Sequence, residues 1–223
     1  MGKVVSLITA RGGSKGIPHK NIKHINGKPL VSYSIIESLK SNVDETWVST
    51  EDKKIKKISM EYGAQVIDRP KHLADDIVMP DDSIIHFAQN VDFDWVVFMH
   101  PTSPLIKYEY INDGLELMKS GKYDSVFSGT LEHWIPRWSE DVKPVDWCIW
   151  NRPRRQDMPN TYIENGMLYI TKREHLLASK LRYSGRIGVV EIPLMDSFQV
   201  DSQDDFNLIE KLIKLGEDNV RHK

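Results

Sequence analysis

Short runs of β-branched and aromatic residues alternate with longer amphipathic segments along the first half of the chain. The runs at residues 4–9, 45–50, 65–67, 94–99 and 125–128 predict strands, and the segments at 29–39, 52–62, 81–88 and 107–120 predict helices. This alternation is typical of a parallel sheet with crossover helices, and the run at 94–99 predicts a central strand buried on both faces. We therefore expect an α/β fold with a mostly parallel sheet.

The pattern changes over residues 129–165, where tryptophans and a cluster of arginines replace the helical period. These residues are Trp134, Trp138, Trp147, Trp150, Arg152, Arg154 and Arg155. Aromatic residues and arginine are enriched in the cores of protein interfaces, which favours an arm or a subunit contact. The alternative is that the tryptophans cover the domain's own sheet.

Regular elements resume after this segment. Residues 167–171 and 188–192 predict strands, and residues 173–179 and 204–215 predict helices. No internal repeat appears. A chain of 223 residues with this organisation predicts a single domain over residues 1–223, with 129–165 as an arm.

Charge and composition exclude several classes of partner. The 30 Lys and Arg residues are balanced by 32 Asp and Glu residues, so no basic excess is available for a nucleic-acid backbone. The early apolar run Val4–Ile8 is too short for a membrane span or a secretion signal. The single cysteine, Cys148, cannot form an intramolecular disulfide. We expect a cytoplasmic protein that binds neither nucleic acid nor membrane.

The segment that follows the first predicted strand carries the clearest chemistry. It reads ARGGSKGIPHKN over residues 10–21. Its glycines let the backbone approach a ligand closely, and Arg11, Lys15 and Lys20 supply cationic donors for phosphate oxygens. Loops at the C-terminal ends of parallel strands bind ligands, so the segment predicts a polyphosphate site, although its spacing fits neither the P-loop nor the dinucleotide motif. The alternative is a flexible glycine turn with solvated lysines.

Several short motifs in the same order extend this observation over most of the chain. They are residues 10–21, Gly27–Leu30, Val48–Thr50, Arg69–Pro70, Leu73–Asp76, Pro101–Leu105 and Asn165–Gly166. With these motifs the sequence resembles the CMP-sialic acid synthetases, or acylneuraminate cytidylyltransferases, including CMP-nonulosonic acid synthetases. The resemblance implies a Rossmann-like nucleotidyltransferase fold, a three-layer sandwich with a dimerisation arm, and a homodimer.

The resemblance also implies a reaction. The anomeric hydroxyl of an acidic nine-carbon sugar would attack the α-phosphate of CTP, and pyrophosphate would leave, with Mg²⁺ or Mn²⁺ as the cofactor. Two alternatives stay open. A nucleotidyltransferase of the same fold could use another nucleoside triphosphate and a sugar phosphate, and a nucleotide-binding relative could lack turnover.

Carried over by position, the resemblance assigns a nucleotide site. Its predicted residues are Ala10, Arg11, Gly12, Gly13, Ser14, Lys20, Asn21, Arg69 and Asp76. Arg11, Lys15 and Lys20 would hold the triphosphate, and Asn21 would lie beside the ribose or the phosphate. Arg69 would reach the base, because a guanidinium donates to the O2 and N3 acceptors of cytosine. The alternatives are an ion pair of Arg69 with Asp68 or Asp75, and a helix N-terminal charge for Asp76.

The resemblance also assigns a sugar site. Its predicted residues are His100, Thr102, Ser103, Arg155, Asn165 and Tyr169. His100 stands where the family usually has glutamine, so we expect either a group that titrates near pH 7 or a structural histidine. Arg155 would pair with a sugar carboxylate or lie in a solvated surface patch. Asn165 would bind the ligand or form a turn.

The predicted metal site departs from the family pattern. The usual Asp-x-Asp before the last helix is here Gln199-Val200-Asp201, so one carboxylate is lost. Mg²⁺ accepts a single carboxylate together with substrate phosphates and waters. We therefore predict Asp201 as both the metal ligand and a catalytic residue, with a helix cap as the alternative.

Overall fold

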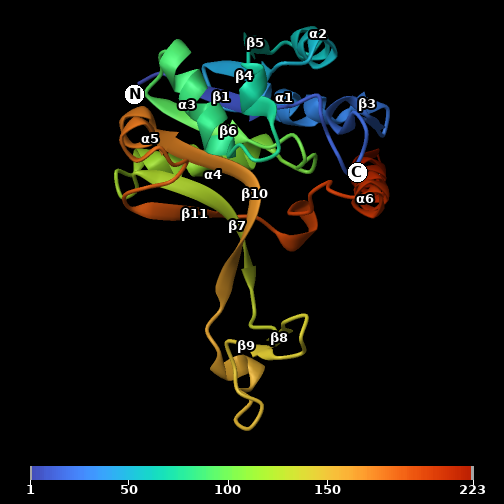
Figure 1. Ribbon diagram of the computed structural model, residues 1–223, viewed down its shortest axis with the longest axis vertical. Helices are drawn as coiled ribbons and strands as arrows, with labels where there is room; N and C mark the ends of the chain where they lie inside the picture. Colours follow the sequence, from blue (N-terminus) through green and yellow to red (C-terminus); the bar gives the residue numbers. More distant parts are fainter. Residues whose placement is uncertain (1, 222–223) are drawn as a thin grey trace.

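The computed structural model describes residues 2–221, and each predicted strand and helix is present (Figure 1). The strands are β1 (Val4–Thr9), β2 (His24–Ile25), β3 (Lys28–Pro29), β4 (Glu45–Thr50), β5 (Gln65–Asp68), β6 (Trp95–Met99), β7 (Ser125–Glu132), β8 (Arg137–Trp138), β9 (Pro144–Val145), β10 (Thr161–Lys172) and β11 (Ile187–Glu191). The α-helices are α1 (Leu30–Lys40), α2 (Lys53–Glu61), α3 (Pro80–Asn90), α4 (Tyr108–Lys119), α5 (Arg173–Ser179) and α6 (Gln203–Arg221). Four short 3₁₀ helices join them: η1 (Lys20–Ile22), η2 (Lys71–Ala74), η3 (Arg155–Asp157) and η4 (Leu194–Asp196).

Seven strands form the central sheet in the order β11-β7-β10-β6-β1-β4-β5. All neighbours run parallel except at β10, which is antiparallel to both β6 and β7. The predicted mostly parallel α/β sheet is therefore confirmed. The crossover helices place the C-terminal ends of β1, β4 and β6 at one edge of the sheet, where the loop after β1 lies.

Helices cover both faces of the sheet. On β6, Val97 points to the face covered by α1, α2 and α4, and Phe98 points to the face covered by α3 and α5. The expected burial of this central strand on both faces is confirmed, since Val96 to Met99 are at most 1% exposed. Each such side chain contributes about 1.5–3 kcal/mol through burial. The three-layer sandwich is confirmed.

Local signals set the ends of the elements. Asp52 caps α2 by accepting hydrogen bonds from the N–H groups of Lys54 and Ile55, a contact that contributes about 1 kcal/mol. Gly63 follows α2 with φ = 92°, a left-handed conformation that glycine adopts without strain. Asn26 and Gly27, both at positive φ, form the two-residue turn between β2 and β3. The sequence carried this hairpin signal, although we did not predict the hairpin.

A third apolar cluster ties the last helix to the loop region. Phe206 and Ile209 of α6 pack with Ile17, Ile25 and Leu30, which lie in and just beyond the segment after β1. The C-terminal helix therefore supports the loop from outside the sheet. No helix among residues 2–221 has the length and apolarity needed to cross a bilayer.

An arm projects from the body of the molecule. Strands β7 and β10 run beyond the sheet as a two-stranded ribbon, and β8 and β9 lie near its far end (Figure 1). Both long strands extend into the 129–165 segment, which we had predicted without regular structure. Trp147 packs edge-on against Trp138 at 5.0 Å and Trp134 at 6.4 Å between ring centroids. These three rings contact one another in the arm, so the alternative that they cover the sheet is wrong.

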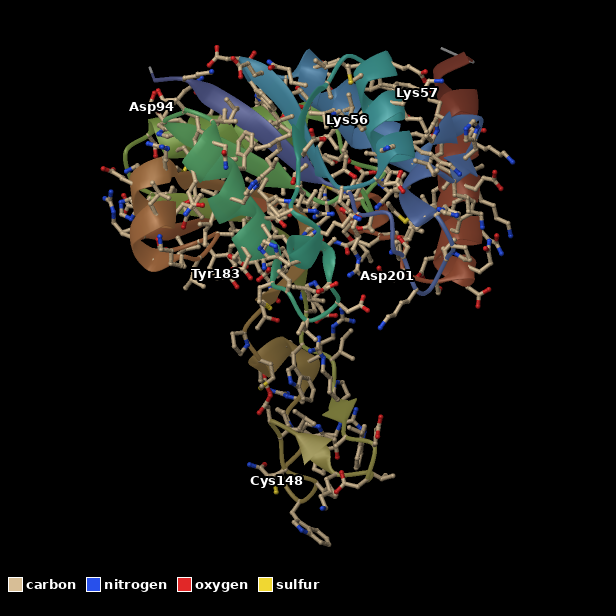
Figure 2. All side chains as sticks on the ribbon, turned by 45° about the horizontal axis from the view of Figure 1, so that its top comes forward. Lys56, Lys57, Asp94, Cys148, Tyr183 and Asp201 are labelled. Atoms are coloured by element: carbon tan, nitrogen blue, oxygen red, sulfur yellow. The ribbon has the colours of Figure 1, made fainter. Side chains whose placement is uncertain are left out.

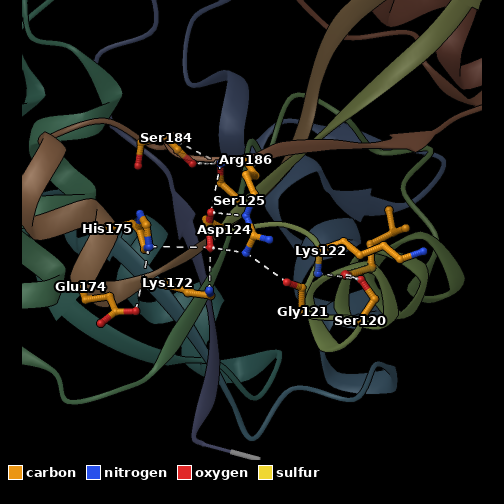
Figure 3. Close-up of polar contacts among 11 residues, drawn as sticks. Ser120, Gly121, Lys122, Asp124, Ser125, Lys172, Glu174, His175, Ser184 and Arg186 are labelled. Carbon is orange, nitrogen blue, oxygen red and sulfur yellow. Dashed lines mark hydrogen bonds and ion pairs between the residues drawn. The ribbon is translucent and has the colours of Figure 1, made fainter.

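A cluster of charges holds together the edge of the sheet opposite the loop (Figure 3). Asp124, directly before β7, accepts from Lys172 at 2.8 Å and from Arg186 at 3.0 Å, and His175 lies 3.8 Å away. The Arg186 and Lys172 hydrogen bonds hold the pKa of the Asp124 carboxyl far below its ordinary value. Asp124 thus joins β7, β10, α5 and β11 at one point.

Candidate active site

A cleft of about 540 Å³ lies at the C-terminal ends of β1, β4 and β6. This is the edge at which parallel sheets bind ligands, and the volume is that of a small-molecule site. The structure brings together ten of the predicted residues on its wall. They are Arg11, Ser14, Lys15, Lys20, Asn21, Arg69, Asp76, His100, Thr102 and Asp201.

The loop after β1 is docked at two of its glycines, Gly12 and Gly16. The N–H of Gly12 donates to Glu51 Oε1 at 2.7 Å. A Cβ on Gly12 would come within 2.7 Å of the Asp52 carboxylate, and one on Gly16 would come within 2.8 Å of the Asp201 carbonyl. A side chain is therefore disfavoured at both positions, by the Asp52 side chain at Gly12 and by backbone at Gly16.

The loop has a docked half and an open half. Ala10 is fully buried and its N–H donates to the Ser49 carbonyl at 3.0 Å. Ala10 and Gly12, both predicted to belong to the nucleotide site, thus use their N–H groups within the chain. By contrast, a Cβ on Gly13 would meet no atom within 4 Å, and Ser14 lines the cleft.

Asp76 bridges two cations of the loop. Its carboxylate lies 2.8 Å from Arg11 Nη2 and also pairs with Lys15 Nζ. The hydrogen bond from Lys15, followed by that from Arg11, keeps the pKa of Asp76 below its ordinary value. Helix α3 begins only at Pro80, so the alternative of a helix N-terminal charge is wrong. The carboxylate sits between the two cations as an anionic ligand would.

Lys20 reaches across the cleft to the segment before α6. Its Nζ donates to the Val200 carbonyl at 2.8 Å and to Asp201 Oδ1 at 3.2 Å. Helix α6 is capped instead by Ser202, whose N–H donates to Asp205 at 2.7 Å while its Oγ accepts from the Asp205 N–H at 3.2 Å. Asp201 is therefore not the cap of the final helix.

Arg69 is held by a residue that we did not predict. Its Nη2 and Nε donate to Glu51 Oε2 at 2.7 and 3.2 Å, and its Nη1 lies 3.5 Å from Ser83 Oγ. Of the alternative partners, Asp68 pairs with Lys56 at 2.7 Å, and no ion pair of Arg69 with Asp75 occurs among residues 2–221. The sequence feature that could have identified Glu51 is its position as an acidic residue directly after a predicted parallel strand.

Asn21 presents an unpaired acceptor at the cleft. Its Nδ2 donates to the Arg11 carbonyl at 2.9 Å, whereas its buried Oδ1 has no hydrogen-bond partner among the described residues. A buried acceptor without a donor costs about 1–3 kcal/mol. The geometry therefore favours a ligand group that donates a hydrogen bond here.

His100 follows β6 on the cleft wall. Its ring packs edge-on against Phe98 at 4.8 Å between centroids. Burial, and then the positive charge of Arg182, lowers the pKa of His100 to about 4. Of the two roles expected for His100, this favours the structural histidine over a group that titrates near pH 7, because its environment disfavours the charged form.

The next residues of this turn have different placements. Thr102 lines the cleft, and its carbonyl accepts from the Val200 N–H at 2.8 Å. Ser103, predicted to bind the sugar, is fully buried and does not line the cleft. The turn thereby joins the end of β6 to the segment that carries Asp201.

Asn165 and Tyr169 line a second cavity of about 480 Å³, which shares Asp201 with the cleft. Asn165 lies inside β10 at a register shift, so it does not form a hairpin turn. Its Oδ1 accepts from Ser128 Oγ at 2.5 Å and from the Met167 N–H at 3.2 Å. The Tyr169 hydroxyl donates to Glu164, and burial raises the pKa of Tyr169.

Arg155 lies apart from these cavities. It is in η3 on the arm, and it lines surface hollows there together with Trp134 and His133. The neighbouring Arg154 is paired with Asp157 at 2.7 Å. Within one chain, therefore, Arg155 is not brought to the residues predicted to bind the sugar with it.

The donors near Asp201 suit a metal that binds mostly through its substrate. No group of three His, Cys, Asp or Glu residues able to hold a metal occurs among residues 2–221. The Gln199 side-chain amide donates to the Asn165 carbonyl, and the Asp201 side chain is 73% exposed. One accessible carboxylate is a sufficient protein ligand for Mg²⁺ when phosphates supply further oxygens.

Comparisons with known proteins identify the family. The cytidylyltransferase family model matches residues 5–212. N-acylneuraminate cytidylyltransferase A of Danio rerio is 34% identical over 94% of this chain, which spans about half (50%) of that protein's length. CMP-N,N'-diacetyllegionaminic acid synthase of Legionella pneumophila is 30% identical over 97% of this chain and 98% of its own.

A solved structure supports the fold. CMP:2-keto-3-deoxy-manno-octonic acid synthetase complexed with CTP aligns with a TM-score of 0.75 and 18% identity, over 96% of this chain and 99% of its own. The resemblance found in the sequence is confirmed by these matches. The chain belongs to the cytidylyltransferase family that includes the N-acylneuraminate cytidylyltransferases.

Proposed function

We propose that the chain transfers the cytidylyl group of CTP to an acidic nine-carbon sugar of the sialic or nonulosonic type. The sugar hydroxyl oxygen forms a bond to the α-phosphorus, the bond from that phosphorus to the bridging oxygen breaks, and pyrophosphate leaves. The hydroxyl loses its proton in the same reaction. The observation that carries the proposal is the convergence of Arg11, Lys15 and Lys20 on one cleft with Asn21 and Arg69.

The loop cations act on the triphosphate. A phosphoryl transfer requires positioning and charge neutralisation more than covalent chemistry, which three cationic side chains supply. The triphosphate replaces the Asp76 carboxylate between Arg11 and Lys15. Exchanging one anion for another leaves both cations paired, so the loop is already arranged for its ligand.

Asn21 and Arg69 lie on the part of the cleft wall that recognises the nucleoside. The unpaired Asn21 Oδ1 accepts a hydrogen bond from a ribose hydroxyl, which favours the ribose over the phosphate because an ionised phosphate only accepts. The Arg69 guanidinium donates to cytosine, as its place on the cleft wall permits. Gly16 and Lys20 hold this wall near the Asp201 segment.

Mg²⁺ or Mn²⁺ is the proposed cofactor, with Asp201 as its protein ligand. The metal neutralises charge that develops on the phosphate oxygens when it is bound. Asp201 belongs both to the nucleotide cleft and to the second cavity with Asn165 and Tyr169. We place the sugar in that second cavity, beside the His100 and Thr102 turn.

The experiment that tests the function measures pyrophosphate release. The protein is incubated with each of the four nucleoside triphosphates, a panel of acidic sugars and sugar phosphates, and Mg²⁺. Release with CTP and an acidic sugar, lost when EDTA removes the metal, is the expected result. Release only with another nucleotide and a sugar phosphate would contradict it. Binding of CTP without turnover on any acidic sugar would favour a nucleotide-binding role.

We also propose that two copies associate through the arm. The arm carries exposed apolar side chains, including Trp150 at 94% and Ile149 at 54% exposure. Arg155 lies on the same arm, away from its own chain's cavities, so pairing of two chains gives it access to a second site. Obligate interfaces of this kind have apolar cores.

Paired Ile149→Asp and Trp150→Ser substitutions are expected to raise the dimer dissociation constant at least about 100-fold, because hot-spot aromatic residues dominate interface energies. Light scattering during size-exclusion chromatography measures the mass. Met60→Ser, which replaces an apolar side chain on α2 with an exposure of 59%, close to that of Ile149, is the control and should leave the dimer intact. A wild-type monomer at high concentration would contradict the association.

A further inference from the structure

Glu51 joins the two ends of the cleft. It follows β4 directly, and its two carboxylate oxygens have different partners. Oε1 accepts from the Gly12 N–H at 2.7 Å, in the loop after β1, whereas Oε2 accepts from Arg69 Nη2 at 2.7 Å and from Nε at 3.2 Å. Both side chains are shielded from water, with exposed fractions of 15% for Glu51 and 5% for Arg69.

On the Arg69 side, the contact determines which donors face the cleft. The guanidinium donates from Nε and Nη2 to Glu51 and from Nη1 to Ser83 Oγ at 3.5 Å, so the second N–H of Nη1 is left for a ligand. A planar guanidinium with two of its nitrogens bound cannot turn. Glu51 therefore fixes the direction of the remaining N–H groups.

On the loop side, the contact fixes the residue next to Arg11. Gly12 is held between Glu51 and the α2 cap, where a Cβ would come within 2.7 Å of the Asp52 carboxylate. The position of Gly12 sets the path of the chain into Arg11 on one side and into the open half at Gly13 on the other. One carboxylate thus supports both the phosphate end and the base end.

We propose that Glu51 is a positioning residue that couples triphosphate binding to base recognition and thereby favours cytosine over uracil. N3 accepts a hydrogen bond in cytosine and donates one in uracil. A guanidinium in a fixed orientation directs its N–H at the N3 position, where cytosine has an acceptor and uracil has a donor. A guanidinium that is free to turn can instead donate to the O2 or O4 acceptors of uracil. This inference rests on the proposed nucleotide site.

Tripolyphosphate tests the coupling because it engages the loop and has no base. Arg69→Met removes the partner of Oε2 and leaves a buried, unpaired charge on Glu51 beside the loop. We expect calorimetric titration to show tripolyphosphate binding about tenfold weaker in this variant. The double variant Arg69→Met/Glu51→Gln removes both charges, and it should return to within about threefold of the wild type.

Independent roles for the two residues predict other results. Unchanged tripolyphosphate binding in Arg69→Met, or a double variant no tighter than the single one, would overturn the coupling. Recovery in the double variant also excludes misfolding as the cause of the loss. If the wild type binds neither CTP nor tripolyphosphate, the proposed function fails, which is a different outcome.

Base preference is the second measurement. Glu51→Gln keeps one oxygen and so retains only one of its two contacts. We expect the ratio of UTP to CTP dissociation constants to fall about tenfold. Glu45→Gln, at the other end of β4 where Glu45 pairs with Lys3 at 2.8 Å, is the matched control and should leave the ratio unchanged. An unchanged ratio in Glu51→Gln would overturn the claim about cytosine.

Discussion

Arg11→Ala is expected to lower kcat/KM for pyrophosphate release from CTP by about 10²–10³-fold. The guanidinium faces the phosphates in the proposed complex, and removing one preorganised donor to developing charge has an effect of this size. In the free protein Arg11 contacts Asp76 at 2.8 Å and the Ala74 carbonyl at 3.3 Å at a partly exposed position. Its loss should therefore change stability by less than about 1 kcal/mol.

Lys20→Ala should have a comparable effect on turnover, with some loss of stability because Lys20 also binds the Val200 carbonyl. Steady-state rates and calorimetric CTP titrations separate kcat from binding. Lys57→Ala, on the exposed face of α2 (Figure 2), is the matched control for loss of a positive charge. Full CTP binding and turnover in both Arg11→Ala and Lys20→Ala would show that the loop does not bind the triphosphate.

The sheet could be predicted from the sequence because the patterns that identify its strands and helices are local. Strands buried on both faces, such as Trp95–Met99, appear as uninterrupted apolar runs, and the caps at Asp52 and Gly63 lie within a few residues of the helix ends. The loop could also be placed, since it directly follows the first strand. The composition of the loop predicted an anion-binding site without information about distant residues.

The missed features depend on contacts between distant residues. Glu51 acquires its role through Gly12 and Arg69, which are brought to it only when β1, β4 and β5 pair in register. The same limit applies to Asn165. Its Asn-Gly pair signals a turn locally, but pairing of β10 with β7 makes it a bulge within a long strand.

The strands of the arm were missed for a related reason. Alternation in β7 and β10 weakens beyond the sheet, because neither face of the ribbon is buried there. Without a buried face, the period-two pattern that identifies a strand is lost. The tryptophans still identified the segment as different from the rest of the chain. Cys148 is exposed near the far end of the arm (Figure 2) and forms no disulfide within the chain.

His100 is expected to destabilise the protein as the pH falls. Its pKa is about 4 in the folded chain and 6.5 ordinarily, because the ring is buried and faces the positive charge of Arg182, whereas Asp201 and Asp81 act in the opposite direction and Lys20 adds a smaller lowering effect. Between pH 4 and pH 6.5 the unfolded state binds more protons than the folded state, so the free energy of unfolding rises with pH. Above about pH 6.5 the ring is neutral in both states, and the free energy of unfolding no longer changes through His100. Lowering the pH from 7.5 to 5 should remove about 2 kcal/mol through His100.

Urea unfolding of the wild type and of His100→Gln at both pH values isolates this contribution, since the other titrating groups are common to the two proteins. The wild type should lose about 2 kcal/mol more than the variant between pH 7.5 and pH 5. A neutral glutamine at the same place on the cleft wall supplies no proton linkage. Equal losses would mean that His100 is solvated like a histidine in water, and its packing against Phe98 at 4.8 Å would then not hold in solution.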